Sequence, residues 1–196
     1  MAIIELADLK TFLGITGTSE DDLLQIYLDA TNEFVGQYCK RTFEETEYTQ
    51  ELYDGTGHVA LNLRNYPIVE VEEVLVETEE VTERTDVGEE GYYIQNADWG
   101  ILYNDDLWSR GRGNVQVTYT AGYDASSMPA GLKLAAYKIA AYMRNTGKRT
   151  GIRSESLGSY SYSLSAESNS LNNVIPDILA NLLLSRYRKR DLGIIF

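Results

Sequence analysis

The spacing of apolar residues changes twice along the chain, from a helical period to a period of two and back again. The first helical stripe consists of Leu6, Leu9, Phe12 and Leu13. A second stripe consists of Leu23, Tyr27, Ala30, Phe34 and Tyr38. These spacings predict two helices within residues 6–39, and Gly14 has the position of a residue that ends the first helix.

A period of two then runs through residues 43–123. It predicts strands over residues 46–53, 59–63, 68–77, 92–95 and 115–120. The turn sequence at residues 54–57 predicts a hairpin between the first two strands. The third strand alternates apolar and acidic residues, which is typical of an antiparallel sheet with one side in water. The acidic, turn-rich residues 77–91 are expected to form a mobile hairpin tip or a loop.

Helical spacing returns after Tyr123. One stripe comprises Leu132, Ala135, Ala136, Ile139, Ala140 and Met143. Pro129 suits the first turn of this helix, and Gly147 suits its end. A last helix is expected from Pro176 up to the basic residues 186–190. Residues 147–174, rich in Ser, Asn and Gly, lack a clear period, and such a long loop is typical of a functional or a disordered segment.

These elements predict the α+β class: a small bundle of about four helices with an antiparallel β insertion between the second and third helices. We expect a helical core from residues 1–42 plus 124–196 and a β-sheet insertion over residues 43–123.

Charge is divided unevenly along the 196 residues. The whole chain has 17 basic and 30 acidic side chains, a net charge of -13. Residues 1–130 hold 7 basic and 26 acidic side chains, whereas residues 131–196 hold 10 and 4. This disfavours general nucleic-acid binding through the acidic part and allows acidic and basic regions of different copies to meet. Simple solvated faces are the alternative interpretation.

The sequence offers little for catalysis or metal binding. The only histidine, His58, lies in a predicted turn, and neither G-x-S-x-G nor a phosphate-binding loop occurs. The single Cys39 excludes an intramolecular disulfide and a cysteine-rich metal site. We therefore expect no enzyme, no cofactor and no metal. The apolar runs are too short for a transmembrane helix, and no signal peptide is recognised, so we expect synthesis in the cytoplasm.

Several motifs, in their order along the chain, carry a family resemblance. The N-terminal ones are Leu9-Lys10-x-Phe12-Leu13-Gly14-Ile15, Asp21-Asp22-Leu23-Leu24 and Tyr38-Cys39-x-Arg41. The central ones are Leu63-x-x-x-Pro67-Ile68 and Val117-x-Tyr119-x-Ala121-Gly122-Tyr123. The C-terminal ones are Gly151-Ile152-x-Ser154-Glu155-Ser156-Leu157-Gly158-Ser159-Tyr160-Ser161 and Pro176-x-x-Leu179-x-x-Leu182-Leu183-x-x-Arg186-Tyr187-Arg188. Together they resemble the tailed-phage head–tail connector family, also called head-completion or adaptor proteins, although the strand region is longer than in the smallest members.

The resemblance implies a structural virion protein. Such proteins form a ring, commonly of twelve copies, beneath the portal vertex of the capsid. They extend the DNA channel and join the capsid to the tail. The expected partners are the portal protein, a further neck or tail-completion protein and other copies of the chain. DNA is expected to pass without specific binding, and no membrane is involved. The expected location is the neck of the virion, after synthesis in the host cytoplasm.

Two segments are assigned roles on the basis of this resemblance. For docking to the portal we predict Arg186, Tyr187, Arg188, Lys189, Arg190, Ile194, Ile195 and Phe196. For a loop at the channel or against a neighbouring copy we predict Arg153, Glu155, Leu157, Tyr160 and Tyr162. The alternatives are a tail that frays or folds back on its own core, and a loop that is only a linker.

Two other functions stay open. One is a different neck or tail-completion protein with the same ring architecture. The other is a binding module for carbohydrate or peptide that uses the aromatic residues Tyr92, Tyr93, Trp99 and Trp108. The 15 tyrosines favour a protein that works through contacts with proteins, because tyrosine is enriched at interfaces.

Overall fold

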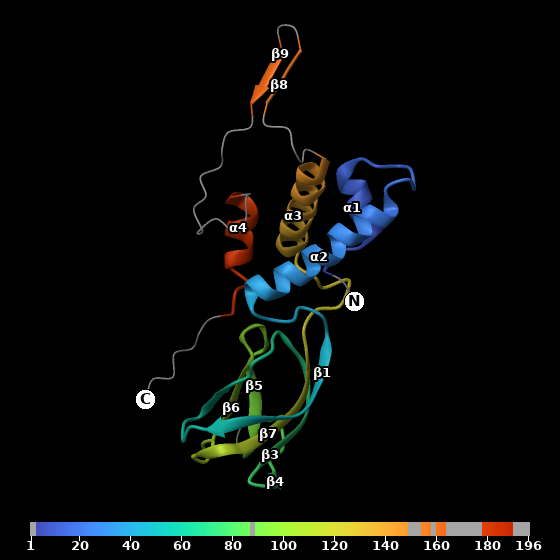
Figure 1. The fold of residues 1–196 in the computed structure, drawn as a ribbon. Coiled ribbons are helices and arrows are strands. Elements are labelled where there is room, and N and C mark those ends of the chain that lie inside the picture. Colours follow the sequence, from blue (N-terminus) through green and yellow to red (C-terminus); the bar gives the residue numbers. More distant parts are fainter. Residues whose placement is uncertain (1–2, 87–88, 149–153, 158–159, 164–177, 190–196) are drawn as a thin grey trace. The chain divides into compact units, whose positions relative to one another are not determined.

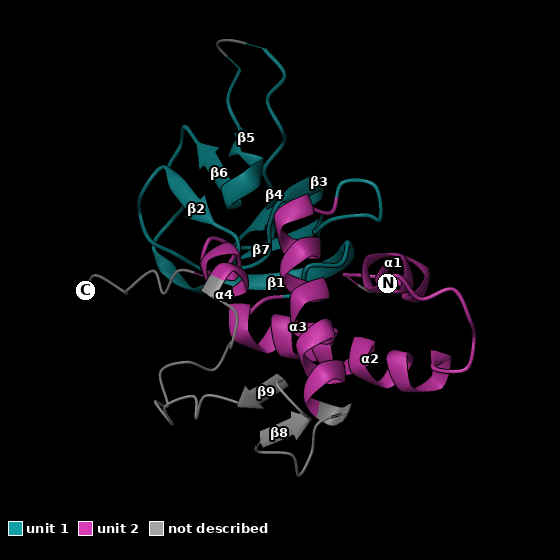
Figure 2. Cartoon of the chain, turned by 90° about the horizontal axis from the view of Figure 1, so that it is seen from above, with its two compact units in different colours: residues 1, 42–127 teal, residues 2–41, 128–196 magenta. Residues whose placement is uncertain are grey.

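A computed structural model of the chain describes residues 3–86, 89–148, 154–157, 160–163 and 178–189 (Figure 1). The chain divides into two compact units (Figure 2). One, the strand unit, comprises residues 42–127. The other, the helical unit, comprises residues 2–41 and 128–196.

The helical unit contains α1 (Leu6–Leu13), α2 (Asp21–Cys39), α3 (Ala130–Lys148) and α4 (Ile178–Ser185). Its buried apolar side chains include Leu9, Leu24, Leu28, Val35, Leu132, Ala136, Ile139 and Leu184. Two ion pairs join the helices at their ends, between Lys10 and Asp21 at 2.6 Å and between Arg144 and Glu20 at 2.8 Å. The two pairs therefore tie α1 to the start of α2 and the residue before α2 to α3.

Two of the three predicted helix ends agree with the structure. Gly14 ends α1 in the left-handed conformation, with φ at 68°, as its position predicted. Leu132 donates its backbone N–H to the carbonyl of Pro129 at 3.0 Å, so Pro129 forms part of the first turn of α3. The predicted helix end at Gly147 is wrong, because α3 continues to Lys148.

The buried stripe of α2 differs from the stripe in the sequence prediction. The structure buries Leu24, Leu28, Thr31, Val35 and Cys39. The predicted residues, including Leu23 and Ala30, flank that stripe and keep exposed surface. One step along a helix turns the side chain by about 100°, so two apolar stripes one residue apart lie side by side, and the pattern alone does not select between them.

The strand unit contains two antiparallel sheets. The first has the order β1-β7-β3-β4, formed by β1 (Thr46–Gly55), β7 (Gly111–Ala121), β3 (Ile68–Val76) and β4 (Glu79–Glu80). The second has the order β2-β6-β5, formed by β2 (Ala60–Asn62), β6 (Ile101–Asn104) and β5 (Tyr92–Asn96). A short 3₁₀ helix, η1 (Ala97–Trp99), precedes β6.

Both sheets contribute to one apolar core. Its members include Tyr53, Val71, Val74, Val115, Val117 and Tyr119 from the first sheet and Leu61, Tyr92 and Leu102 from the second. Trp108, which is fully buried, lies in the same cluster and donates its indole N–H to the carbonyl of Val59 at 3.0 Å. The strand unit thus holds a hydrophobic core of its own.

The predicted hairpin between the first two strands is wrong. β1 pairs with β7, and β2 pairs with β6, so the two strands belong to different sheets. Asp54, predicted in the turn, lies in β1, and its side chain accepts a hydrogen bond from the backbone N–H of Gly113 in β7 at 2.7 Å. The strand β6 was not predicted from the sequence.

The α+β class holds, but the description as a helical bundle with a single antiparallel insertion is wrong. Seven strands in two sheets form a unit with its own core, and this part of the molecule is mostly β. Periodicity identified most of the strands, but it carries no information about which strands pair or how many sheets they form.

Part of the segment predicted as a loop forms a hairpin. β8 (Ser154–Leu157) pairs with β9 (Tyr160–Ser163) in antiparallel register. Among the described residues, no helix has the length and apolar composition that a membrane crossing requires.

Candidate functional site

The first half of the predicted docking segment follows α4 directly. Arg186 and Arg188 are exposed, whereas Tyr187 and Lys189 are half-buried. The backbone N–H of Lys189 donates to the carbonyl of Cys39 at 2.8 Å, and the guanidinium carbon of Arg188 lies 5.9 Å from the ring centre of Tyr38. Residues 186–189 therefore lie against the C-terminal end of α2. Arg190, Ile194, Ile195 and Phe196 lie outside the described residues.

The thiol of Cys39 is buried beneath this segment. Its Sγ donates to the carbonyl of Leu184 at 3.8 Å. Burial raises the pKa of Cys39 to about 11, although the nearby charges of Arg41 and Arg188 oppose the shift. The thiol is therefore protonated at neutral pH and serves as a packing residue, not as a reactive nucleophile.

The predicted loop residues fall on the β8–β9 hairpin. Glu155 pairs with Tyr162, and Leu157 pairs with Tyr160. Because positions two apart and positions directly opposite share a face of an antiparallel ladder, the register places all four positions on the same face. The other face has serine at every paired position, 154, 156, 161 and 163. Arg153 lies outside the described residues.

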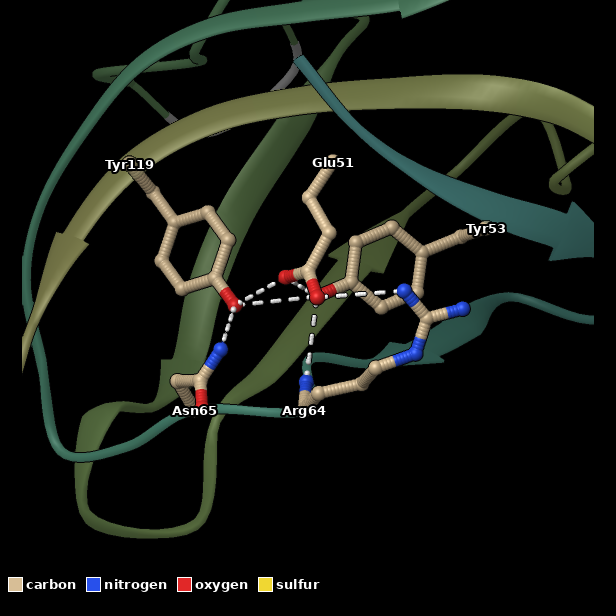
Figure 3. Close-up of polar contacts among 5 residues, drawn as sticks. All are labelled: Glu51, Tyr53, Arg64, Asn65 and Tyr119. Carbon is tan, nitrogen blue, oxygen red and sulfur yellow. Dashed lines mark hydrogen bonds and ion pairs between the residues drawn. The ribbon is translucent and has the colours of Figure 1, made fainter. Parts of the chain in front are cut away.

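The most connected polar cluster of the strand unit surrounds Glu51 (Figure 3). One carboxylate oxygen, Oε2, lies 2.5 Å from the hydroxyl of Tyr53 and 2.6 Å from the hydroxyl of Tyr119. The two hydroxyls are 2.9 Å apart. Two phenol protons serve these three contacts, and the two shorter contacts involve the charged acceptor. We therefore assign both protons to hydrogen bonds with Glu51.

The same cluster holds the loop between β2 and β3. Arg64 donates from its guanidinium to Glu51 at 3.1 Å and from its backbone N–H to Tyr53 at 3.1 Å. Asn65 donates to the hydroxyl of Tyr119 at 3.2 Å. The five side chains thus join β1, β7 and this loop through charge-assisted and neutral hydrogen bonds.

The pKa shifts of Glu51, Tyr53 and Tyr119 indicate that this cluster stabilises the fold and does not transfer protons. Burial raises the pKa of Glu51, but the hydrogen bonds from Tyr119, Tyr53 and Arg64 outweigh it and lower the pKa overall. Burial and the neighbouring carboxylate raise the pKa of Tyr53 and of Tyr119. Glu51 is therefore a weak base and both phenols are weak acids, the opposite of what proton transfer near neutral pH requires. Sequence patterns missed the cluster because Tyr119 lies far along the chain from the other four members and reaches them only in the folded strand unit.

The residues that the sequence analysis considered for catalysis or metal binding do not come together in one site. His58 is exposed in the connection between β1 and β2. The acidic residues of β3, such as Glu70 and Glu72, lie on its exposed side, where Thr120 donates to Glu72 at 3.3 Å. Within the described residues, no group of three or more His, Cys, Asp or Glu side chains has an arrangement that holds a metal ion.

The four aromatic residues proposed for a binding module do not form one platform. Trp108 and Tyr92 are buried in the core of the strand unit. Tyr93 is half-buried and pairs with Tyr103 at 5.1 Å between ring centres, while Trp99 is 45% exposed on η1. Only part of this set is accessible to a ligand, which weakens the binding-module interpretation.

The fold is similar to that of chains from phage-like particles. One structure, the neck of an empty gene transfer agent (GTA) particle computed with C6 symmetry, has a TM-score of 0.57 at 18% identity and covers 97% of this chain and 92% of that chain. The neck of a native GTA particle computed with C12 symmetry has a TM-score of 0.55 at 17% identity, with coverages of 96% and 90%. The virion of a native GTA particle gives 0.54 at 17%, with coverages of 97% and 92%.

The model of the head completion protein family matches residues 2–188, so the chain belongs to this family. The predicted family is thereby confirmed, together with the structural role of joining head and tail, and the assignment supports a non-enzymatic protein. No curated protein matches the sequence.

Proposed function

We propose that the protein forms an oligomeric ring in the neck of a tailed particle, beneath the portal, where it extends the DNA channel and joins the capsid to the tail. The family match over residues 2–188 carries this proposal. The fold adds support, because two similar structures are necks computed with sixfold and twelvefold symmetry. About twelve copies is the expectation that the resemblance supplies.

The negative charge of the strand unit suits a component of a DNA channel. Residues 42–127 hold 4 basic and 19 acidic side chains, so the strand unit carries most of the negative charge. An acidic surface repels phosphates, and DNA that passes such a wall slides without binding. On this proposal DNA is cargo in transit, and no base or phosphate recognition is required.

Two segments are proposed to make the contacts that the ring needs. Residues 186–190 and the apolar Ile194, Ile195 and Phe196 dock on the portal, with the basic side chains pairing with its acidic groups. The β8–β9 hairpin, with Glu155, Leu157, Tyr160 and Tyr162 on one face, lies at the channel or against the next copy. Arg153 belongs to the same proposed contact. These roles rest on position and chemistry.

Capture from lysate of the source particle tests the docking role. The tagged full chain is compared with a truncation that lacks residues 190–196, which leaves the backbone bond between Lys189 and Cys39 in place. A variant with Leu52→Glu serves as the surface control, because Leu52 is 49% exposed in the strand unit. We expect the full chain and the control to retrieve one large ring-forming protein, and the truncation to lose it.

The same experiment distinguishes a portal-binding protein from a different neck or tail-completion protein. If the full chain retrieves a neck or tail protein in place of the portal, the protein occupies a lower position in the neck. If the truncation still retrieves the portal, residues 190–196 are not required for docking, and the contact lies within the part of the chain that the truncation keeps. If neither the full chain nor its variants retrieve a virion protein, the proposed role itself is contradicted.

A further inference from the structure

Helix α2 presents apolar residues to solvent beside the stripe that it buries. Leu23 is 41% exposed and Ile26 is 62% exposed. Ala30, one turn further, is exposed as well. Steps of three and four residues place these side chains in one strip along the helix, which we call the α2 patch. Single exposed apolar residues are ordinary, but a continuous strip marks an interaction surface.

Three carboxylates line one side of the α2 patch. Asp22, Asp29 and Glu33 are exposed and flank Ile26 at helical spacing. Gln25 donates to Asp29 at 2.8 Å and Gln37 donates to Glu33 at 2.8 Å. Within the described part of the chain, no lysine or arginine forms an ion pair with these three carboxylates. The rim of the α2 patch is therefore negative.

Helix α4 carries a second strip with the opposite charge. Leu182 is 64% exposed, and Leu179, nearly one turn earlier, is also exposed. Both lie on the side of the helix opposite Ala180 and Leu184, which are buried. Arg186 follows four residues after Leu182 and is exposed. We call Leu179, Leu182 and Arg186 the α4 patch; its rim is positive.

The two patches lie towards opposite ends of α2. Tyr38 donates to Asn181 at 2.7 Å, so α4 packs beside the C-terminal end of α2. Ile26 lies thirteen residues before Cys39, which separates the patches by about 20 Å along the axis of α2. One copy of the chain therefore cannot close the two patches on each other.

We propose that the α2 patch of one copy docks on the α4 patch of the next copy. Both patches are apolar strips on helices, and their rims carry opposite charges. A contact between two different surfaces is heterologous, and its repetition around an axis produces a closed ring when the rotation closes, as the proposed ring function requires. Pairing α2 with α2 instead brings two acidic rims together, which is unfavourable. This inference rests on the proposed ring function and adds the surfaces that form the ring.

Two charged variants test the head-to-tail contact. Ile26→Glu disrupts only the α2 patch, and Leu182→Glu disrupts only the α4 patch. We expect each variant alone to lose the assembly of the wild-type chain, with association weakened by more than about tenfold, because an interface anchor is replaced by a charge. An equal mixture still pairs one intact α2 patch with one intact α4 patch, so it forms dimers that cannot grow. Leu52→Glu is the control and is expected to assemble like the wild type.

Cross-linking in the assembled state separates failure of this contact from failure of the ring. The double variant Ile26→Cys, Leu182→Cys is oxidised in the oligomer of the pure chain or, if the pure chain is a monomer, in the assembled neck; the native Cys39 is buried. We expect a ladder of covalent multimers from the double variant and no multimers from either single variant.

Each other outcome overturns the proposal. A covalent dimer from Ile26→Cys alone indicates a symmetric contact. A ring visible by electron microscopy without any cross-link shows that other surfaces form it, and the proposed function then stands. Absence of a ring, both in the pure chain and in the neck, overturns the contact and the proposed function together. Normal assembly of Ile26→Glu excludes the α2 patch.

Discussion

Glu51 accepts hydrogen bonds from two buried phenols and one arginine, so a single carboxylate organises the centre of the strand unit. The charge is kept because its partners replace the water that burial removes. Such a cluster stabilises only as a complete set, since each donor that is lost leaves a buried polar atom without its partner. The cluster can be tested through one of its donors and through the charge of its acceptor.

Replacing Tyr119 by Phe should lower the free energy of unfolding by about 2 kcal/mol. The change keeps the ring in the core but removes the hydroxyl that donates to Glu51 and accepts from Asn65. Urea unfolding of both variants provides the measurement, with Tyr142→Phe as the control because Tyr142 is 40% exposed. Equal stability of the two variants contradicts the assigned network.

The Glu51 charge should stabilise the protein only above acidic pH. The pKa of Glu51 is lowered in the folded state from its ordinary value of 4.5, so the unfolded chain binds the proton first as the pH falls. The stability that this pKa difference adds is full above the unfolded value and is lost as the pH falls through the folded value.

Comparison with Glu51→Gln makes this measurable despite the many other carboxylates. We expect the wild type to be more stable than the variant at about pH 7 and the difference to shrink towards about pH 3. Urea unfolding at several pH values gives the difference directly. A stability difference that is constant over this range shows that the charge of Glu51 contributes nothing.

At the scale of elements, the sequence predicted more than it did at the scale of residues. Among the described residues, the periods identified the four helices and five of the strands. They did not identify β6. They also missed the stripe that α2 buries, because two apolar stripes compete on that helix. The Glu51 cluster escaped prediction for another reason: Glu51 and Tyr119 meet only through the pairing of β1 with β7, and pairing leaves no trace in local spacing.

The end of β7 offers a test of the element geometry. Gly122 has φ at 122°, and a Cβ built there lies 2.3 Å from the carbonyl oxygen of Glu44. We expect Gly122→Ala to lower the free energy of unfolding by about 2 kcal/mol or more, because both the backbone conformation and a neighbouring backbone oppose the methyl group.

Gly17→Ala is the matched control for this substitution. Gly17 has no atom within 4 Å of a built Cβ and no positive φ. Its replacement should leave the stability unchanged or raise it slightly through the unfolded chain. Thermal unfolding of both variants distinguishes them, and a neutral Gly122→Ala contradicts the geometry described for the end of β7.

For the whole molecule, the family was predictable from ordered motifs, whereas the architecture was only partly so. The α+β class followed from periodicity, but the strand unit is a two-sheet structure with its own core and not a simple insertion into a bundle. The sequence alone also showed that charge is divided unevenly along the chain. The two charged surfaces, the α2 patch and the α4 patch, could be identified only from the structure, because they become apparent only when the buried faces of both helices are known.

A ring of this chain between head and tail is the function on which the other proposals depend. Electron microscopy of the neck of its own particle is the decisive experiment, with the ring identified by a tag fused to the chain. We predict a closed ring of copies of this chain between the portal and the next neck protein. A neck in which the tagged chain is absent, or present as a single copy, contradicts the proposed function.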